Sequence, residues 1–510
     1  MTNTVNTIRN ARVGLLLGAF LAATTMFSAA PAAAADKDTL TIALAANFQS
    51  LDPHKTGVVG TDLSVASHVY SPLIIMNPDL KLSPALATKW ETVEPTRWRF
   101  TLRPDVKFPD GKPVDATVVK WNIERILNPE TKAPWANRYK LIERVEVVDP
   151  TTVDIFTSQP FPALAAQLSM FLIMSPDWTA SHNPAVEAFG SGPYELVEFK
   201  AGSSIKLKAR DDYWGEKPDF ANVEFRVMPE AASRISGLLA GEIDVITGFA
   251  TTEIERINKS GKANAGAIPS NRVNGVRFNT LKPPFAGNID LRLALNYAVD
   301  KQGIMDGIWG PITTLSQCQV LNEGYFGFNP NLKPMPYDPA KAKELLAKAG
   351  FANGLDLTFE VPRGRYLSGE DISQVVAAQL AEVGVNLKIV EIEFSTYMER
   401  LFAKQLPELS YFGTAWPTWD ADGQLTAFQP GDPSSYYDNK EFSALIDQAR
   451  TEIDVEKRKE LYWKATDLMC ADPSGIFMFD QPLTYAQSND VVWGVRGDDW
   501  MRAYDVKRKN

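Results

Sequence analysis

The sequence contains few of the residues that carry metal or nucleophilic chemistry. It has three histidines, His54, His68 and His182, and two cysteines, Cys318 and Cys470. The histidines lack metal-ligand spacing, and the cysteines form no Cys-x-x-Cys pair. The sequence has no Gly-x-Ser-x-Gly elbow, no Walker-type phosphate loop and no dinucleotide-binding glycine motif. These absences argue against the common metalloenzymes, serine hydrolases and nucleotide-binding enzymes, although an enzyme without such motifs stays open.

The chain also lacks an excess of basic residues and a long apolar segment beyond its start. Lysine and arginine number 52 and aspartate and glutamate 62, so the net charge is -10. An acidic chain is a poor partner for nucleic acid or an anionic membrane surface. After residue 35, no segment stays apolar and uncharged for the roughly 20 residues that a membrane-spanning helix needs.

The first 35 residues have the three parts of a signal peptide. Arg9 and Arg12 give a positive start, Val13–Phe27 is an apolar run, and a series of alanines follows. Cleavage is predicted after Ala34 or Ala35, and the alternative is an uncleaved anchor. No cysteine follows the apolar run, so the mature chain is expected to be free in the periplasm rather than lipid-anchored.

An oxidising compartment permits a disulfide between Cys318 and Cys470. Their separation in sequence neither supports nor forbids a bond, because the distance and direction of the side chains decide. A disulfide and two buried thiols are both open at this point.

Local patterns predict a mixed α/β chain of more than one domain. Residues 36–510 exceed the size at which a single core stops growing. Asp338 and Pro339 are an N-cap and a first helical residue, and Gly350 is a stop signal. A second helical pattern ends at Gly384 and passes directly into the alternating strand pattern of Val385–Ile389. A helix followed at once by a strand is typical of an α/β domain.

Two segments carry candidate ligand-binding residues. The stretch from Trp416 to Gly423 contains Trp416, Trp419 and Asp420, and its turn residues predict an irregular loop. Tryptophan beside a carboxylate suits stacking and hydrogen bonding to a ligand, but two tryptophans can equally close the edge of a core. Arg365 can hold a carboxylate through two parallel hydrogen bonds, and the alternative is a solvated loop arginine.

A series of short motifs in order extends over nearly all of the mature chain. They are Leu51–His54, Pro84–Trp90, Phe100–Gly111, Gly190–Tyr194, Asp212–Trp214, Gly241–Asp244, Leu291–Asp300 and Tyr337–Gly350. With these motifs the chain resembles the extracellular solute-binding proteins of family 5, the dipeptide, oligopeptide and nickel type. Each motif alone is weak evidence for the family, but the occurrence of all of them in the family's order is specific evidence.

The resemblance implies two α/β lobes that close over a ligand by a hinge motion. Lobe one would combine residues 36–75, 190–283 and 479–510, an extra domain would span 76–189, and lobe two would span 284–478. The resemblance implies a monomer that has no cofactor or metal and catalyses no reaction. Its partners would be a small organic ligand in the cleft and the permease and ATPase of an ABC importer.

The same resemblance suggests the site residues. In dipeptide-binding relatives, an arginine at the position resembling Arg365 meets the ligand carboxylate. Asn47 and Phe48 would close the site from lobe one, with Trp416 and Trp419 as apolar walls.

One departure from the family leaves the ligand open. The family's Gly-Asp, whose aspartate pairs with the amino group of a peptide, is replaced by Ala415-Trp416. Either Asp420 binds the ammonium, or the ligand has none. A peptide or peptide-like ligand is the first expectation, and an oligosaccharide or opine-like sugar conjugate is the second. A hydrolase or a periplasmic chaperone on the same scaffold is the third, and the scarcity of histidine disfavours nickel.

Overall fold

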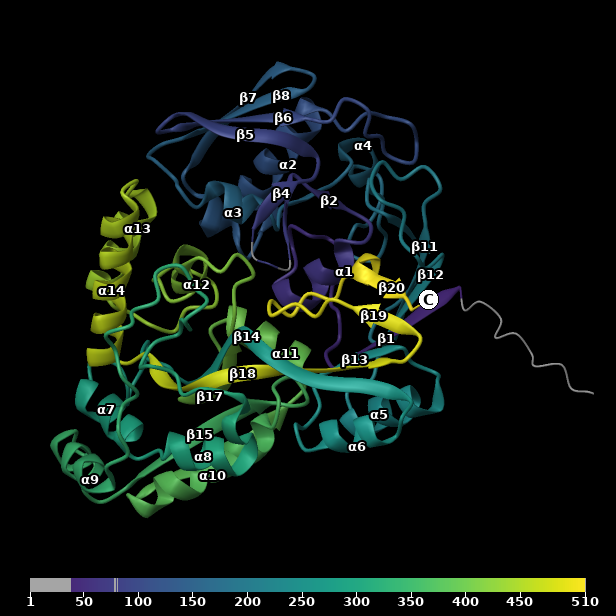
Figure 1. Ribbon diagram of the computed structural model, residues 1–510. Helices are drawn as coiled ribbons and strands as arrows, with labels where there is room; N and C mark the ends of the chain where they lie inside the picture. Colours follow the sequence, from purple (N-terminus) through teal and green to yellow (C-terminus); the bar gives the residue numbers. More distant parts are fainter. Residues whose placement is uncertain (1–37, 78, 80, 510) are drawn as a thin grey trace, which may run out of the picture. The chain divides into compact units, whose positions relative to one another are not determined.

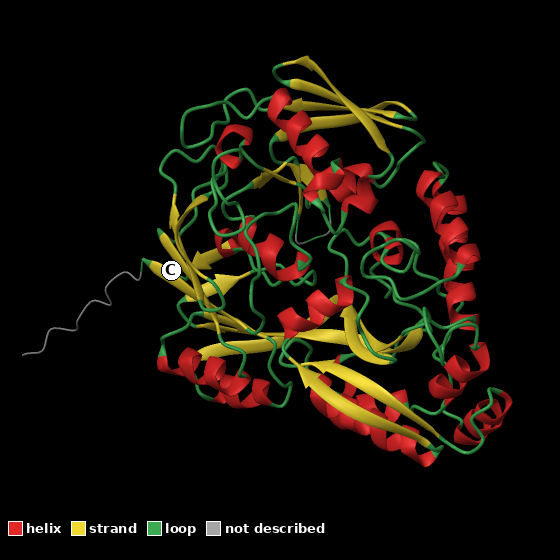
Figure 2. Cartoon of the chain, turned by 180° about the vertical axis from the view of Figure 1, so that it is seen from behind, coloured by secondary structure: helices red, strands yellow, loops and turns green. Residues whose placement is uncertain are grey.

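The computed structural model describes residues 38–77, 79 and 81–509, which are shown from two sides in Figures 1 and 2. The predicted signal peptide and its cleavage point lie outside the described residues. Within the described part of the chain, no helix has the length and apolar character to cross a membrane.

A single sheet of ten strands organises the fold. Its strand order is β10-β11-β12-β1-β13-β18-β14-β17-β15-β16. The bounds of these strands, in sheet order, are Tyr194–Lys200, Ser204–Ala209, Asn222–Val227, Thr39–Leu44, Val245–Thr247, Gly475–Ser488, Ala263–Phe278, Leu409–Thr414, Leu355–Pro362 and Val385–Ile392.

Two long antiparallel strands, β14 and β18, run through the middle of this sheet (Figure 1). On one side β18 pairs with β13, and on the other side β14 pairs with β17. The sheet therefore has two halves that share only these two strands. We call the half that contains β1 and β13 lobe one, and the half that contains β17, β15 and β16 lobe two. The domain boundaries expected from the family resemblance stay predictions. Strand β18 continues across the boundary that is expected at residue 478.

Parallel strands joined through helices occur in both lobes. In lobe one, β1 pairs in parallel with β12 and β13, and helix α5, Ala231–Ala240, connects these two neighbours. In lobe two, β15 pairs in parallel with β16, and α10, Gly369–Glu382, connects them. Parallel neighbours need such a crossover. The predicted α/β class is confirmed.

A separate antiparallel sheet lies at the top of Figure 1. Its order is β5-β6-β8-β7, with bounds Ala87–Glu94, Arg97–Leu102, Thr152–Thr157 and Ile142–Asp149. Helix α2, Ala116–Leu127, packs on this sheet through buried residues that include Val119 and Ile123. The carboxylate of Asp115 caps the helix by accepting from the backbone N–H of Thr117 and Val118. This unit falls within the predicted extra domain.

The remaining elements are short sheets and further helices, of which α1 and α12 are fully buried. Three two-stranded sheets pair β2 Ser71–Pro72 with β9 Leu172–Ile173, β3 Ile74–Met76 with β4 Leu82–Pro84, and β19 Val491–Trp493 with β20 Val506–Arg508. The helices are α1 Ser64–Ala66, α3 Leu164–Leu168, α4 Pro176–Thr179, α6 Glu253–Lys259, α7 Ile289–Tyr297, α8 Lys301–Ile308, α9 Pro339–Lys348, α11 Phe394–Phe402, α12 Ala421–Thr426, α13 Lys440–Thr451 and α14 Val455–Ala471.

The helix signals in lobe two lie where the sequence predicts them. The carboxylate of Asp338 accepts from the N–H of Lys341, and Pro339 is the first residue of α9. Gly350 and Gly384 adopt positive φ values of 95° and 90° after α9 and α10. An L-residue with a side chain would be strained there, so these glycines end their helices.

Cys318 and Cys470 form a disulfide, with their Cα atoms 5.4 Å apart. The bond joins a loop after α8 to the end of α14, across 152 positions of sequence. The alternative of two free thiols is thereby excluded.

Replacing both cysteines by serine is expected to lower the free energy of unfolding by about 2–5 kcal/mol, because the bond restricts a long loop of the unfolded chain. Urea unfolding of the variant against the oxidised protein measures this difference. Reducing the wild-type protein should give a similar loss, and an unchanged unfolding midpoint in both experiments would contradict the expectation.

Candidate functional site

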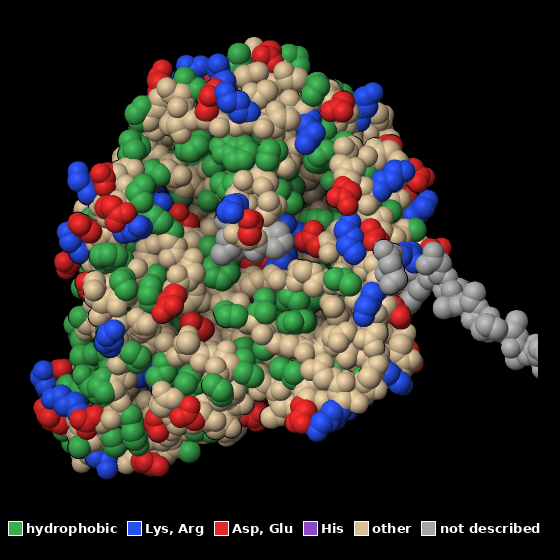
Figure 3. Space-filling model, in the orientation of Figure 1, with side chains coloured by type: hydrophobic (Ala, Val, Ile, Leu, Met, Phe, Trp, Pro, Cys, Tyr) green, Lys and Arg blue, Asp and Glu red, His purple; other side chains and the backbone are tan. Residues whose placement is uncertain are grey.

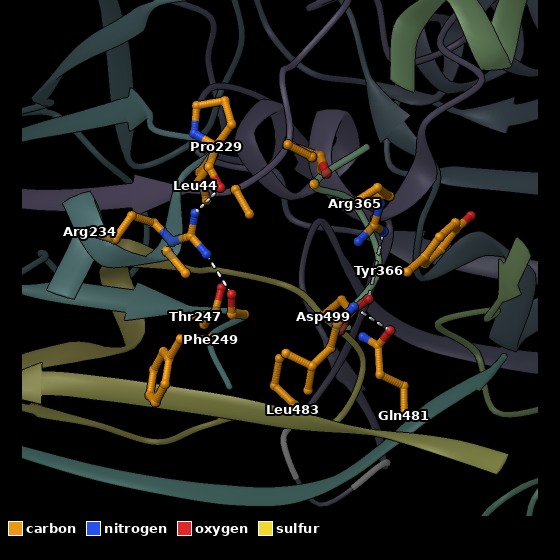
Figure 4. A pocket seen from close by; sticks show the side chains of 18 of the residues that line it. Leu44, Pro229, Arg234, Thr247, Phe249, Arg365, Tyr366, Gln481, Leu483 and Asp499 are labelled. Atoms are coloured by element: carbon orange, nitrogen blue, oxygen red, sulfur yellow. Dashed lines mark hydrogen bonds and ion pairs between the residues drawn. The ribbon is translucent and has the colours of Figure 1, made fainter. Parts of the chain in front are cut away.

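A cavity of about 420 Å³ lies between the two lobes, and we call it the outer chamber (Figure 4). Lobe one contributes the end of β1 and the start of α5, and lobe two contributes the loop between β15 and α10. Strand β18, the C-terminal segment, the loop after β13 and the segment around α1 complete the lining. The polar side chains of the lining include Arg234, Arg365, Tyr366, Gln481 and Asp499. The volume is within the range that small organic ligands occupy in proteins, about 300–1,000 Å³.

Arg234 lies on the lobe-one side of the outer chamber and is committed to the backbone. Its guanidinium donates to the carbonyl oxygens of Met228, Pro229 and Gly248. Burial lowers the pKa of Arg234 to about 10, so it remains charged at neutral pH. Through these hydrogen bonds Arg234 holds loops of lobe one together, and it does not extend across the chamber.

On the opposite side, Arg272, Arg365 and Asp499 form a charged cluster, which we call the Arg-Asp-Arg cluster (Figure 4 labels Arg365 and Asp499). Arg272 comes from β14, Arg365 from the loop after β15, and Asp499 from the C-terminal segment. Arg272 donates to the Asp499 carboxylate through Nε at 3.1 Å and also through Nη2. Arg365 Nη2 lies farther away, 3.9 Å from the same carboxylate oxygen.

The cluster carries one more positive charge than negative. Burial alone would raise the pKa of Asp499, but the charges of Arg272 and Arg365 lower it below its ordinary value, so the carboxylate is ionised. Burial, together with repulsion from Arg272, lowers the pKa of Arg365 to about 10, and Arg365 stays protonated at neutral pH. A ligand carboxylate would offset this surplus charge.

Arg365 has hydrogen-bonding capacity to spare. It donates no hydrogen bond to any residue that the structure describes, and its Nε is buried without a partner. Its loop is nonetheless fixed, because Tyr366 Oη donates to the carbonyl of Gly413 and the Leu367 N–H donates to Gln481 Oε1. A guanidinium held in place with open donors is prepared for a planar anion.

A second cavity of about 160 Å³ adjoins the first, and we call it the inner chamber. Gly60, Arg365 and Tyr366 line both chambers, so the Arg365 side chain lies where they meet. Most of the inner chamber is lined by lobe two, including Trp416, and Arg138 reaches it from the extra domain.

Trp416 lines the inner chamber, but its ring is already engaged. The guanidinium carbon of Arg138 lies 3.8 Å from the centre of the Trp416 ring, and Trp416 Nε1 donates to Gln167 Oε1 at 3.1 Å. Arg138 also pairs with Asp432 at 3.2 Å. Trp416 thus joins lobe two to the extra domain, and its role as a ligand wall stays a prediction.

Trp419 and Asp420 are among the lining residues of neither chamber. Trp419 has a φ of 53°, and its ring packs against Tyr325 with ring centres 5.4 Å apart. Asp420 Oδ1 accepts from Arg458 Nη2 at 2.7 Å and from the backbone N–H of Asp422. The prediction of an irregular loop is wrong for the second half of this stretch, because Asp420 is the N-cap of α12. The ligand contacts expected of Trp419 and Asp420 stay predictions.

Asn47 and Phe48 lie just beyond the part of the chain that lines the outer chamber, which is Leu44–Ala46. Phe48 is buried against Phe199, with ring centres 5.9 Å apart. The following residues are fixed because the Asp62 carboxylate accepts from the backbone of Gln49 and Ser50. The predicted ligand contacts of Asn47 and Phe48 stay predictions.

Sequence reasoning found Arg365 but missed its two partners in the Arg-Asp-Arg cluster. Arg272 and Asp499 are 227 positions apart, and neither stands in a recognisable motif. Nothing in the sequence links them, because only the folded chain brings the C-terminal segment beside β14, where the Asn271 N–H donates to the carbonyl of Gly497.

On the face shown in Figure 3, acidic and basic side chains are interspersed, without one extended patch of either sign. The Arg-Asp-Arg cluster and Arg138 are instead inside the cleft, where a small ligand can reach them but a large charged surface cannot. The charge distribution therefore favours a small ligand as the partner of this site.

Comparison with known families identifies the architecture. Residues 81–438 match the model of the bacterial extracellular solute-binding proteins, family 5, middle region. The glutathione-binding protein GsiB of Pectobacterium atrosepticum is 28% identical over 468 residues, which are 88% of this chain and 90% of that protein.

Solved structures share the fold over nearly their full lengths. The periplasmic binding protein DppA of Helicobacter pylori, in complex with the peptide STSA, superposes with a TM-score of 0.85 at 24% identity, covering 92% of this chain and 98% of that one. MoaA of Agrobacterium tumefaciens R10, in complex with mannopinic acid, has a TM-score of 0.84 at 26% identity, covering 93% and 100%. The chain thus has the two-lobed fold of periplasmic binding proteins.

Proposed function

Because this chain belongs to the bacterial extracellular solute-binding proteins of family 5, we propose that it captures a peptide or peptide-like ligand between its lobes. The ligand enters the outer chamber and is handed to the permease and ATPase of an ABC importer. The protein acts as a monomer in the periplasm after its signal peptide is removed, and it releases the ligand chemically unchanged.

The observation that carries this proposal is the state of Arg365. Its side chain is 15% exposed, it faces both chambers, and its nearest carboxylate is 3.9 Å away. A buried guanidinium with unused donors is costly unless an anion completes it. A ligand carboxylate supplies that anion, and bidentate geometry makes the contact specific.

The outer chamber also contains acidic side chains that suit an ammonium group. Glu230, Glu370 and Asp371 line it, and Glu230 and Asp371 are exposed. A ligand with a carboxylate at Arg365 and an amino group toward these acids, such as a peptide, matches the charges of both signs in the chamber. This assignment gives the ammonium a partner other than Asp420, which Arg458 already neutralises.

Titration of the mature chain tests the proposal. The protein is purified natively, freed of bound ligand by unfolding and refolding, and titrated calorimetrically with dipeptides, tripeptides, glutathione and mannopinic acid. At least one peptide or glutathione is expected to bind one to one with a Kd of about 1 μM or tighter, near -8 kcal/mol. Mass spectrometry of the recovered ligand should show it unchanged.

Two results would count against the proposal. If only mannopinic acid binds, the ligand is a sugar conjugate and the peptide assignment fails. If the recovered ligand is cleaved, the protein is an enzyme on this scaffold.

A further inference from the structure

The inner chamber holds more positive charge than its own carboxylates balance. Among the described residues, four guanidinium groups line it, those of Arg138, Arg272, Arg277 and Arg365, and one carboxylate, that of Asp432. Arg138 pairs with Asp432, and Arg272 pairs with Asp499. Arg365 shares Asp499 at a longer distance, and Arg277 forms no ion pair within the described part of the chain.

Arg277 projects from β14 and is half-buried. Its guanidinium carbon lies 4.9 Å from the centre of the Phe412 ring and 5.8 Å from that of Tyr436. Its one hydrogen bond to a described residue runs from Nη1 to Tyr397 Oη at 3.5 Å. The rings position the guanidinium by cation–π contact, but most of its five N–H donors remain unused.

Nearby charges do not satisfy Arg277 either. Glu360 lies two strands away in the same row of the sheet, because Ser410 pairs with both Arg277 and Glu360. Glu360 itself pairs with Arg400 through Oε2 at 3.0 Å, while its Oε1 is buried without a hydrogen bond to a described residue. Lys404, which stacks on Tyr436, donates to three backbone carbonyls and adds a further positive charge. Among the described residues, no carboxylate forms an ion pair with Arg277, although Glu360 keeps an unpaired oxygen in the same row of the sheet.

The geometry points to Arg277 as the centre of a second anion-binding subsite, which selects peptide-like ligands that bear two carboxylates. This inference rests on the proposed function: one carboxylate binds Arg365 where the chambers meet, and the second enters the inner chamber and binds Arg277. A cavity of about 160 Å³ is roughly the volume of five water molecules, enough for a carboxylate on a short side chain. The aromatic rings beside Arg277 lower the local polarity, which strengthens the pairing of the two charges.

An isosteric pair of dipeptides, Ala-Glu and Ala-Gln, tests the subsite, with glutathione as a second probe that carries two carboxylates. Calorimetric titration of the wild-type mature chain is expected to show tighter binding of Ala-Glu by about 10-fold or more, as expected for a hydrogen bond between charged groups. Arg277→Gln should bind Ala-Glu and Ala-Gln equally and keep the wild-type affinity for Ala-Gln. The matched variant Arg363→Gln changes an exposed arginine of the ligand-facing loop and should keep the preference.

Thermal melting establishes that Arg277→Gln is folded. If it is not, Arg277→Lys decides, because it keeps the charge and loses the planar fork. This variant should weaken Ala-Glu binding several-fold and leave Ala-Gln binding unchanged, and unaltered Ala-Glu affinity would overturn the subsite. Equal binding of the two dipeptides by the wild type also overturns it while leaving the proposed function standing. Binding of no peptide or glutathione defeats both.

Discussion

Arg365→Ala is expected to weaken ligand binding by about 30-fold or more, because losing one partner of a buried hydrogen-bonded charge pair costs about 2–5 kcal/mol. The variant should still fold, since Arg272 alone continues to neutralise Asp499 through two hydrogen bonds. Calorimetric titration with a ligand identified for the wild type measures the loss. Arg365→Lys should fall between the two proteins, because lysine keeps the charge but cannot form the bidentate contact.

The matched control is Arg363→Ala in the same loop. The Arg363 side chain is 65% exposed and pairs with Glu391 on the surface. This change should alter the affinity by less than about 2-fold, because exposed ion pairs contribute little. Equal affinities of Arg365→Ala and Arg363→Ala would remove Arg365 from the site.

Arg450→Met should lower the free energy of unfolding by about 3–5 kcal/mol, since it leaves a buried carboxylate without its cation. Arg450 Nε donates to Asp422 Oδ1 at 2.7 Å, and the two side chains are 1% and 0% exposed. Asp422 also accepts a hydrogen bond from Gln167 at 3.3 Å, a weaker contact that cannot replace the lost charge. Urea unfolding measures the change.

Two further variants test whether the stranded charge of Asp422 causes this loss of stability. Adding Asp422→Leu to Arg450→Met should recover part of the stability, because the stranded charge is then removed. Arg256→Ala, which breaks an exposed pair with Glu253, should cost less than about 1 kcal/mol. If Arg450→Met also lost less than about 1 kcal/mol of unfolding free energy, water would have to reach the buried pair.

The local parts of the fold could be predicted because their causes are local. The cap at Asp338 and the stops at Gly350 and Gly384 depend on a few neighbouring residues, and each lies where the sequence places it. The ten-stranded order could not be derived this way, because it joins β1 to strands far along the chain. The family resemblance implied two α/β lobes, but no strand order.

The candidate site also has parts that could be predicted from the sequence and parts that could not. Arg365 was visible as an arginine in a glycine-containing loop that resembles a family position. Its pairing with Asp499 depends on three distant segments meeting, and the absence of an ion pair at Arg277 is a property of the folded state alone. Asp420 looked available in sequence because its partner, Arg458, lies on another helix.

The disulfide has a topological consequence for the cleft. Cys318 and Cys470 enclose the loop that carries Arg365, together with the helices from α9 to most of α14. A protease that cuts once inside this loop leaves both fragments covalently joined. Nicked and intact molecules therefore keep the same mass, apart from one added water, until the bond is reduced.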